Sequence, residues 1–191
     1  MRHPYKNGMS LVELILAILL LNVVILTGIS MELGLRRIYT STDVESQLLG
    51  ETAPIIAMIT KDINRGIGDS TNPPVSYPYD TTCVASAGSD PVFCIHADSS
   101  GDGIYDPMTD KEVAYRFHPS ANELWYYMDA SAGGYSILSG KVTGFSVVPQ
   151  PANGTAVISL SVRKDPTQAV NATNPELNIT SEAQFREFSI S

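Results

Sequence analysis

Residues 8–30 read GMSLVELILAILLLNVVILTGIS and decide the fold of this chain. Glu13 is the only charged residue in this segment, and an unbroken apolar run follows it at 14–21. A helix crosses the hydrocarbon core of a bilayer with about 20 apolar residues, and the stretch from Leu11 to Ile29 supplies that length. We therefore predict an N-terminal helix that spans a membrane.

The composition limits the function of the rest of the chain. Its 191 residues include 12 basic and 20 acidic side chains, which gives a formal charge of −8. This balance argues against a general nucleic-acid binder, which needs a basic face. Two cysteines are too few for a disulfide-built scaffold or a four-thiolate zinc site. The three histidines are scattered (His3, His96 and His118), which argues against a histidine-based metal centre.

Three interpretations of the apolar segment compete. A secretory signal peptide has a shorter apolar core and a small-x-small cleavage site, and the small residues at 27–30 keep this interpretation open. A plain anchor gives no reason for Glu13, because an unpaired carboxylate inside an apolar helix is costly. The third interpretation explains Gly8 and Glu13 together: cleavage after Gly8 gives Met9 a positive amine, which Glu13 of a neighbouring copy neutralises inside an apolar bundle.

The segment from Lys6 to Ile15 resembles the cleavage and methylation site of type IV prepilins and pseudopilins. The resemblance implies that a prepilin peptidase cuts between Gly8 and Met9 and methylates the amine of Met9. It also implies that Glu13 supports assembly and that the apolar helices form the core of a filament. Phe is the most frequent first mature residue in this family, so Met9 is a departure from the pattern.

The resemblance also implies a location and a set of partners. Arg2 and Lys6 precede the apolar segment, which favours a cytoplasmic N-terminus. We expect a single-pass protein of the bacterial inner membrane that later joins a periplasmic or extracellular filament or its tip. The expected partners are other pilins or pseudopilins, the prepilin peptidase and the assembly platform, with no nucleic acid.

The helix is predicted to continue beyond the membrane to about residue 66. Apolar residues recur at intervals of mostly three or four, which is typical of an amphipathic helix with one buried stripe. Charged residues, Asp62 among them, lie between these positions. Pro54 predicts a kink or a break, and the glycines at 66 and 68 predict a left-handed cap. The stripe consists of Leu33, Leu35, Ile38, Val44, Leu48, Leu49, Ile55, Ile56, Ile59, Ile63 and Ile67.

Residues 57–68 carry a second, finer resemblance. They resemble the helix end of W-type minor pilins and J-type minor pseudopilins, where an apolar helix finishes in a short acidic-basic run before a glycine turn. This implies a priming or tip subunit of a type IV pilus, with a J-type pseudopilin of a type II secretion system as the alternative. Any amphipathic helix that ends in glycine shares the pattern, so the subfamily stays open.

The remainder of the chain is predicted to form a β-rich head. Period-two segments separated by turn residues predict an antiparallel sheet, with the second half of the helix covering one face. Loops are predicted at 69–91 and 165–178. The predicted strands are 112–117, 124–128, 135–138, 144–148, 158–162 and 185–190. The fold class is therefore α+β, similar to the type IV pilin fold, and its parts are the leader 1–8, the filament-core helix 9–30, the amphipathic spine 31–68 and the extracytoplasmic head 69–191.

Cys83 and Cys94 are eleven residues apart and are predicted to form one structural disulfide outside the cytoplasm. Closing so short a loop stabilises the fold by roughly 3 kcal/mol in the chain-entropy model. The two cysteines lack the CxxC spacing of a redox or metal site.

The densest charge cluster predicts a candidate calcium loop. Six acids and one base lie between Asp90 and Glu112, and the opening DSSGDG resembles an EF-hand loop, with oxygen ligands at alternate places and a glycine at the sixth. Thr109 occupies the place of the bidentate glutamate, and Asp, Ser and Gly also favour turns without metal, so both interpretations stay open. The candidate ligands are Asp98, Ser100, Asp102, Asp106, Asp110 and the backbone carbonyl of Ile104.

No sequence motif predicts an enzyme. The chain has no GxSxG, HExxH, Walker or Rossmann pattern, and its histidines form no nucleophile–base pair by spacing. The aromatic run Trp125-Tyr126-Tyr127 is interpreted as packing on a sheet face. We expect a non-enzymatic subunit. The alternative from another class is a calcium-dependent adhesin or binding module that uses a pilin anchor.

Overall fold

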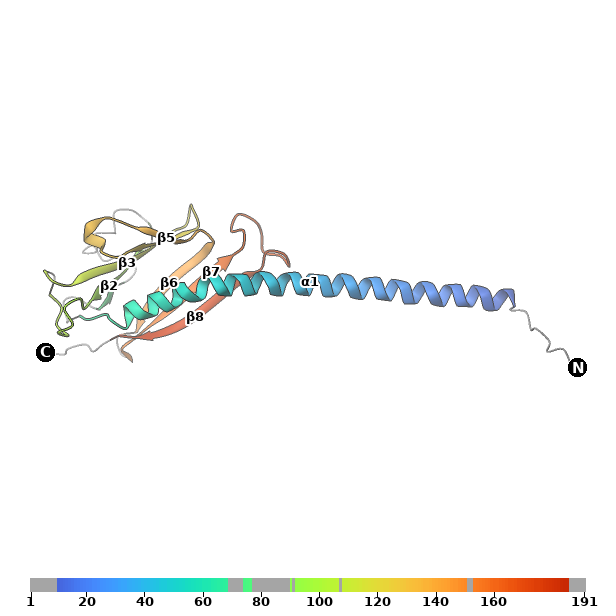
Figure 1. The fold of residues 1–191 in the computed structure, drawn as a ribbon, viewed down its shortest axis with the longest axis horizontal. Coiled ribbons are helices and arrows are strands. Elements are labelled where there is room, and N and C mark those ends of the chain that lie inside the picture. Colours follow the sequence, from blue (N-terminus) through green and yellow to red (C-terminus); the bar gives the residue numbers. More distant parts are fainter. Residues whose placement is uncertain are drawn as a thin grey trace, which may run out of the picture.

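One long helix projects from a β-rich head in the computed structural model of the chain (Figure 1). The structure describes residues 10–68, 74–76, 90, 92–106, 108–150 and 153–185. The helix α1 (Leu11–Ile63) has 53 residues, which is about 80 Å at 1.5 Å per residue. Its second half lies along the head, and its first half extends away from it. This confirms the predicted α+β layout, a long N-terminal helix packed on antiparallel strands.

The described part of the head contains two antiparallel sheets, whereas the sequence predicted one. The first has the strand order β1-β2-β3-β4-β5 and the second has the order β6-β7-β8. The first sheet consists of β1 (Val75–Ser76), β2 (Val92–Ala97), β3 (Lys111–His118), β4 (Glu123–Tyr127) and β5 (Ser136–Ser139), with the 3-10 helix η2 (Ala130–Ala132) before β5. The second consists of β6 (Val142–Gln150), β7 (Thr155–Arg163) and β8 (Glu176–Gln184).

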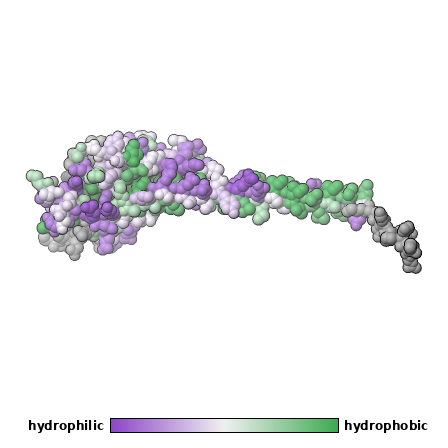
Figure 2. Space-filling view, viewed as in Figure 1, coloured by the Kyte–Doolittle hydropathy of each residue, from purple (hydrophilic) through white to green (hydrophobic). Residues whose placement is uncertain are grey.

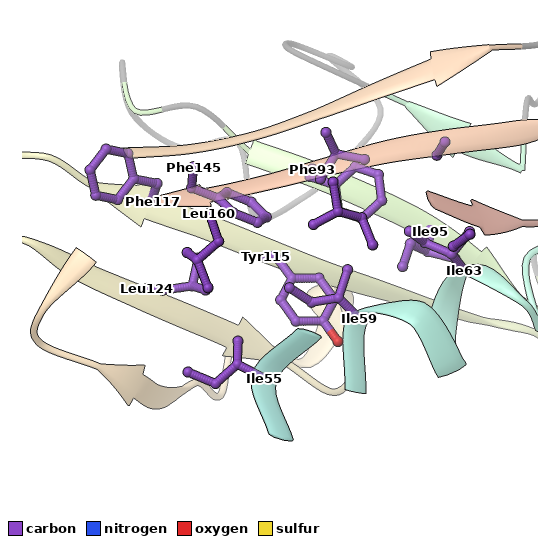
Figure 3. Close-up of a cluster of buried hydrophobic side chains, with 14 of the residues drawn as sticks. Ile55, Ile59, Ile63, Phe93, Ile95, Tyr115, Phe117, Leu124, Phe145 and Leu160 are labelled. Atoms are coloured by element: carbon purple, nitrogen blue, oxygen red, sulfur yellow. The ribbon is translucent and has the colours of Figure 1, made fainter. Parts of the chain in front are cut away.

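A single large hydrophobic core lies between α1 and the inner faces of both sheets (Figure 3). Ile59 and Ile63 of α1 are fully buried in it, together with Phe93 of β2 and Tyr115 of β3. Residues of β7 alternate between buried and partly exposed along the whole strand, as the period-two pattern predicted. Burying a large apolar side chain contributes about 1.5–3 kcal/mol, so this core fixes the second half of α1 to the head.

The buried stripe of α1 begins later than the sequence predicted. Val44 and Leu48 are its first buried members, whereas Leu33, Leu35 and Ile38 are exposed. The reason is geometric, because the head covers the helix only from about residue 44 onwards (Figure 1). The apolar residues before that point lie on the projecting part of the helix.

Pro54 does not break α1, which is continuous from Leu11 to Ile63. The helix ends three residues before Gly66, and the predicted left-handed cap at that glycine is wrong, because Gly66 is not among the residues with positive φ. Its role is close packing. A Cβ atom on Gly66 would lie 2.9 Å from the carbonyl oxygen of Ile63 and 3.3 Å from that of Pro74, so a larger residue would force the backbone to move.

The sequence pattern did not predict strands β1 and β2, and it misplaced the last strand, β8. All six residues of β2 are buried, so the strand lacks the alternation that identifies half-exposed strands. The two-residue strand β1 is too short to give any pattern. The last described strand is β8, which begins inside the loop predicted at 165–178 and ends before Phe185. The predicted strand at 185–190 is therefore wrong at Phe185, and its other residues lie outside the described part of the chain, as does most of the predicted loop 69–91.

Candidate functional site

The first half of α1 is an apolar surface without a partner in the described structure. From Leu11 to Ile29 its large apolar side chains are each 49% to 74% exposed. None of the most apolar 18-residue stretch of the helix is buried. Figure 2 shows this surface as a continuous hydrophobic rod beside a mostly polar head. By length and composition the helix could span a membrane, which agrees with the predicted anchor.

Glu13 lies in the first turn of α1, at the end of the rod that is farthest from the head. Its Oε2 atom accepts a hydrogen bond from the backbone N–H of Ser10 at 3.2 Å. A carboxylate is favourable at a helix N-terminus, where backbone N–H groups carry partial positive charge. Among the described ion pairs none includes Glu13. Gly8 and Met9, the predicted cleavage site, lie outside the described residues.

The acidic loop between β2 and β3 is organised around two carboxylates, those of Asp98 and Asp110. Asp98 is buried, and its oxygens accept backbone hydrogen bonds from Gly101 and from Gly103, the latter at 3.1 Å. Both glycines have φ near +79°, a conformation that favours glycine. The spacing of Asp98 and the two glycines in the DSSGDG segment is therefore that of a folded turn.

Asp110 closes the same loop from its other end. Its Oδ1 atom accepts a hydrogen bond from the N–H of Ser99 at 2.9 Å and its Oδ2 atom accepts one from the N–H of Asp106 at 2.9 Å. Burial raises the pKa of Asp110, but these backbone hydrogen bonds outweigh it and lower the pKa overall. The loop is therefore held by carboxylate-to-backbone contacts at both ends.

The carboxylates of the candidate calcium loop do not form a ready-made metal site in this arrangement. The carboxylates of Asp102 and Asp106 each accept a hydrogen bond from the backbone N–H two residues later, of Ile104 and of Met108, both at 2.9 Å. No group of three or more His, Cys, Asp or Glu side chains that could hold a metal ion occurs among the described residues. Calcium binding by Asp98, Ser100, Asp102, Ile104, Asp106 and Asp110 therefore stays a prediction.

Cys94 is disulfide-bonded and lies in β2. Its side chain is buried in a second, smaller hydrophobic cluster on the outer face of the first sheet, with Val92, Ala114 and Tyr127. Its predicted partner, Cys83, lies outside the described residues. The sulfur of Cys94 therefore forms its disulfide on the outer face of β2.

Aromatic and charged side chains also gather on this outer face. Trp125 stacks on Tyr135 with ring centroids 4.2 Å apart, and the guanidinium of Arg116 lies 5.8 Å from the centroid of the Trp125 ring. Nδ1 of His118 lies 2.6 Å from Oδ2 of Asp90. Trp125 thus packs on the sheet surface, whereas its neighbour Tyr126 packs partly against the main core on the opposite face.

The sequence interpretation missed a buried polar pair between α1 and β3. Asp62, expected on the polar face of the helix, is 8% exposed. The hydroxyl of Tyr115 donates a hydrogen bond to Oδ2 of Asp62 at 2.6 Å, and Figure 3 shows that hydroxyl oriented toward α1. Burial raises the pKa of Asp62 despite this hydrogen bond and the nearby positive charges of Arg65 and Lys61. The sequence did carry one signal for this burial. Asp62 lies three residues after Ile59, and this spacing places it on the same helix face as the buried stripe.

Comparisons with known proteins identify no relative of the chain. No family model, curated protein or solved structure matches the chain.

Proposed function

We propose that this chain is a non-enzymatic minor subunit of a type IV pilin-like filament. In this proposal residues 9–30 hold the subunit in the inner membrane until assembly, a prepilin peptidase removes residues 1–8, and the helix then joins the filament core. The observation that carries the proposal is the division of α1 into an exposed apolar half and a half that packs on the head.

The division of α1 supports an assembly role. A soluble protein rarely exposes a large continuous apolar surface, so the rod from Leu11 to Ile29 needs lipid or other helices around it. Lipid satisfies it in the membrane, and equivalent helices of neighbouring subunits satisfy it in a filament. The continuity of α1 into the head supports transfer as one piece, because the helix that leaves the membrane also carries the head.

The position of Glu13 supports the same role. A carboxylate near one end of an apolar helix is costly in lipid or in a helix bundle unless it is paired. The amine of a Met9 N-terminus on a neighbouring subunit is the partner that the resemblance to prepilins implies. Pairing between subunits makes Glu13 an assembly residue and leaves the folding of the head independent of it.

A filament incorporation experiment tests the proposal. The full chain is expressed with a type IV pilus assembly machinery, filaments are sheared from the cells, and the chain is quantified in the filament and membrane fractions. We expect the wild type in both fractions and a Glu13→Gln variant in the membrane fraction only. Glu32→Gln is the matched control, because Glu32 lies on the same helix and makes only an exposed ion pair with Arg36. Exclusion of the wild type from filaments, or equal incorporation of Glu13→Gln, would contradict the proposal.

A further inference from the structure

A cavity of about 590 Å³ lies beside the last turns of α1, where the helix meets β3 and β4. Three basic side chains line it: Lys61 in the last turn of α1, Arg65 two residues after the helix, and Lys111 at the start of β3. All three are exposed. The chain as a whole is acidic, so a pocket with three cations departs from the general character of its surface.

These three cations make no ion pair within the described part of the chain. The described ion pairs of Lys and Arg involve Arg36, Arg116, Lys141 and Arg163 instead. Basic residues at a helix C-terminus are favoured by the helix dipole, which explains Lys61 and Arg65 without any ligand. It does not explain Lys111, which comes from a different element and faces the same pocket.

The acidic residue in the pocket leaves the cations available. Asp62 also lines the cavity, but its carboxylate is buried and accepts the hydrogen bond of the Tyr115 hydroxyl. It contributes to the wall of the pocket, and it makes no ion pair within 4.0 Å with any described Lys or Arg. The exposed charged side chains that line the pocket are therefore all basic.

Apart from Ser99, the remaining lining is apolar or aromatic. Met58 and Met128 lie at the pocket together with Tyr126, and Met128 is 65% exposed. Methionine side chains adapt to irregular apolar surfaces and are frequent where proteins bind peptides. An inorganic anion would pair with the cations and leave this apolar surface uncovered. A peptide that carries carboxylates next to apolar side chains would satisfy both parts of the lining.

The pocket also lies where a partner protein can reach it. The end of α1 is at the far end of the head from the apolar rod (Figure 1). With the rod held in a membrane or a filament core, this end of the head points away from it.

We propose that this pocket binds an acidic, partly apolar peptide segment of a partner protein, with its carboxylates paired to Lys61, Arg65 and Lys111. The pairing is charge-assisted, and the guanidinium of Arg65 offers a two-pronged contact to one carboxylate. The inference goes beyond the proposed function and does not depend on it, because it rests on the head and the end of α1 and not on the apolar rod.

Calorimetric titration of the full chain in lipid nanodiscs tests this inference. The probes are the blocked peptide Leu-Glu-Leu-Glu-Leu, its neutral counterpart Leu-Gln-Leu-Gln-Leu, and inorganic phosphate. We expect saturable binding of the acidic peptide, no saturable binding of the neutral peptide, and no displacement of the acidic peptide by phosphate at equal concentration. Binding of both peptides alike, displacement by phosphate, or no saturable binding of the acidic peptide would overturn the proposal.

Charge reversal locates the binding. We expect Lys111→Glu to weaken binding of the acidic peptide at least about tenfold, because it replaces an attraction with a repulsion. Lys61→Glu, on the exposed surface of α1, is expected to have a similar effect and serves if the first variant does not fold. Lys164→Glu is the matched control, since Lys164 is exposed and lies outside the pocket. Unchanged binding in a folded Lys111→Glu or Lys61→Glu variant, or equal weakening in Lys164→Glu, would overturn the assignment.

Discussion

The buried hydrogen bond between Tyr115 and Asp62 should make the free energy of unfolding depend on pH. Burial favours the protonated form of Asp62 and raises its pKa. Burial also raises the pKa of Tyr115, and the hydrogen bond to Asp62 adds to this effect. The Tyr115 hydroxyl therefore keeps its proton beyond its ordinary pKa of 10.0, and the titration that matters is that of Asp62.

The sign of the pH effect follows from the raised pKa of Asp62. As pH rises through the ordinary value of 3.8, the unfolded chain loses this proton before the folded chain does. The unfolded state then binds fewer protons, so the free energy of unfolding falls until the pH passes the folded-state pKa. An Asp62→Asn variant keeps an oxygen acceptor for Tyr115 and lacks this titration. We expect its stability relative to the wild type to increase with pH above 3.8, and below that pH the difference should be constant.

Urea unfolding of the full chain in detergent, followed over a pH series, measures this difference. Glu51→Gln provides the control, because Glu51 makes an exposed ion pair with Lys141 and belongs to the same helix. A stability difference for Asp62→Asn that does not change with pH would contradict the raised pKa of Asp62.

Calcium binding to the acidic loop is a second prediction at the level of single residues. The sequence predicts that calcium draws together Asp98, Asp102 and Asp106 and thereby raises the melting temperature of the head. An Asp102→Asn variant should lose most of that increase, while Asp129→Asn, outside the loop, should keep it. Calorimetric titration and thermal unfolding with and without chelator measure the effect, and no heat with no change in melting temperature would remove the site.

Helix α1 accommodates a proline without interruption. Pro54 has no backbone N–H to donate to the carbonyl of Gly50, and its ring crowds that carbonyl. The side of the helix that carries Pro54 is exposed, so the substitution to alanine changes the backbone hydrogen bond more than the packing. We expect Pro54→Ala to raise the free energy of unfolding by up to about 3 kcal/mol. A variant less stable than the wild type would show that the proline is required by the packing of α1 on the head.

Truncation of an isoleucine to alanine should change the stability of the head in the second half of α1 but not in the first half. Ile59 is fully buried, and truncation to alanine should destabilise the head by about 2–5 kcal/mol through lost burial and a cavity. Ile18 is 50% exposed on the rod, and Ile18→Ala should leave the unfolding of the head unchanged. Urea unfolding of both variants in the same detergent makes the comparison. Equal losses would mean that the head depends on the first half of the helix.

The sequence predicted elements where one face of the chain differs from the other. The second half of α1 and the alternating strand β7 carry such a pattern, whereas the rod was predicted from its unbroken apolar run, and each lies close to its predicted position. Strand β2 was missed because both of its faces are buried. The burial of Asp62 depends on the hydroxyl of Tyr115, 53 residues later, and no local pattern records a partner at that distance.

The whole molecule combines two surfaces that need different surroundings. The rod is apolar around its circumference and carries one carboxylate, whereas the region beyond residue 30 holds 19 of the 20 acids and 10 of the 12 bases. Figure 2 shows the change from one surface to the other along α1. An acidic head on a nearly neutral rod suits a subunit that keeps its helix among lipids or other helices and its head in water.

The N-terminal mass of the protein, after co-expression with a prepilin peptidase, tests the account most directly. The account predicts that the mature wild type lacks residues 1–8 and begins with an N-methylated Met9. A Gly8→Leu variant is predicted to keep all eight residues, and Asn7→Ala, next to the cleavage site, is predicted to be processed normally. A wild type that keeps residues 1–8, or a Gly8→Leu variant cut after residue 8, would contradict the assignment of this chain to pilin-like filaments.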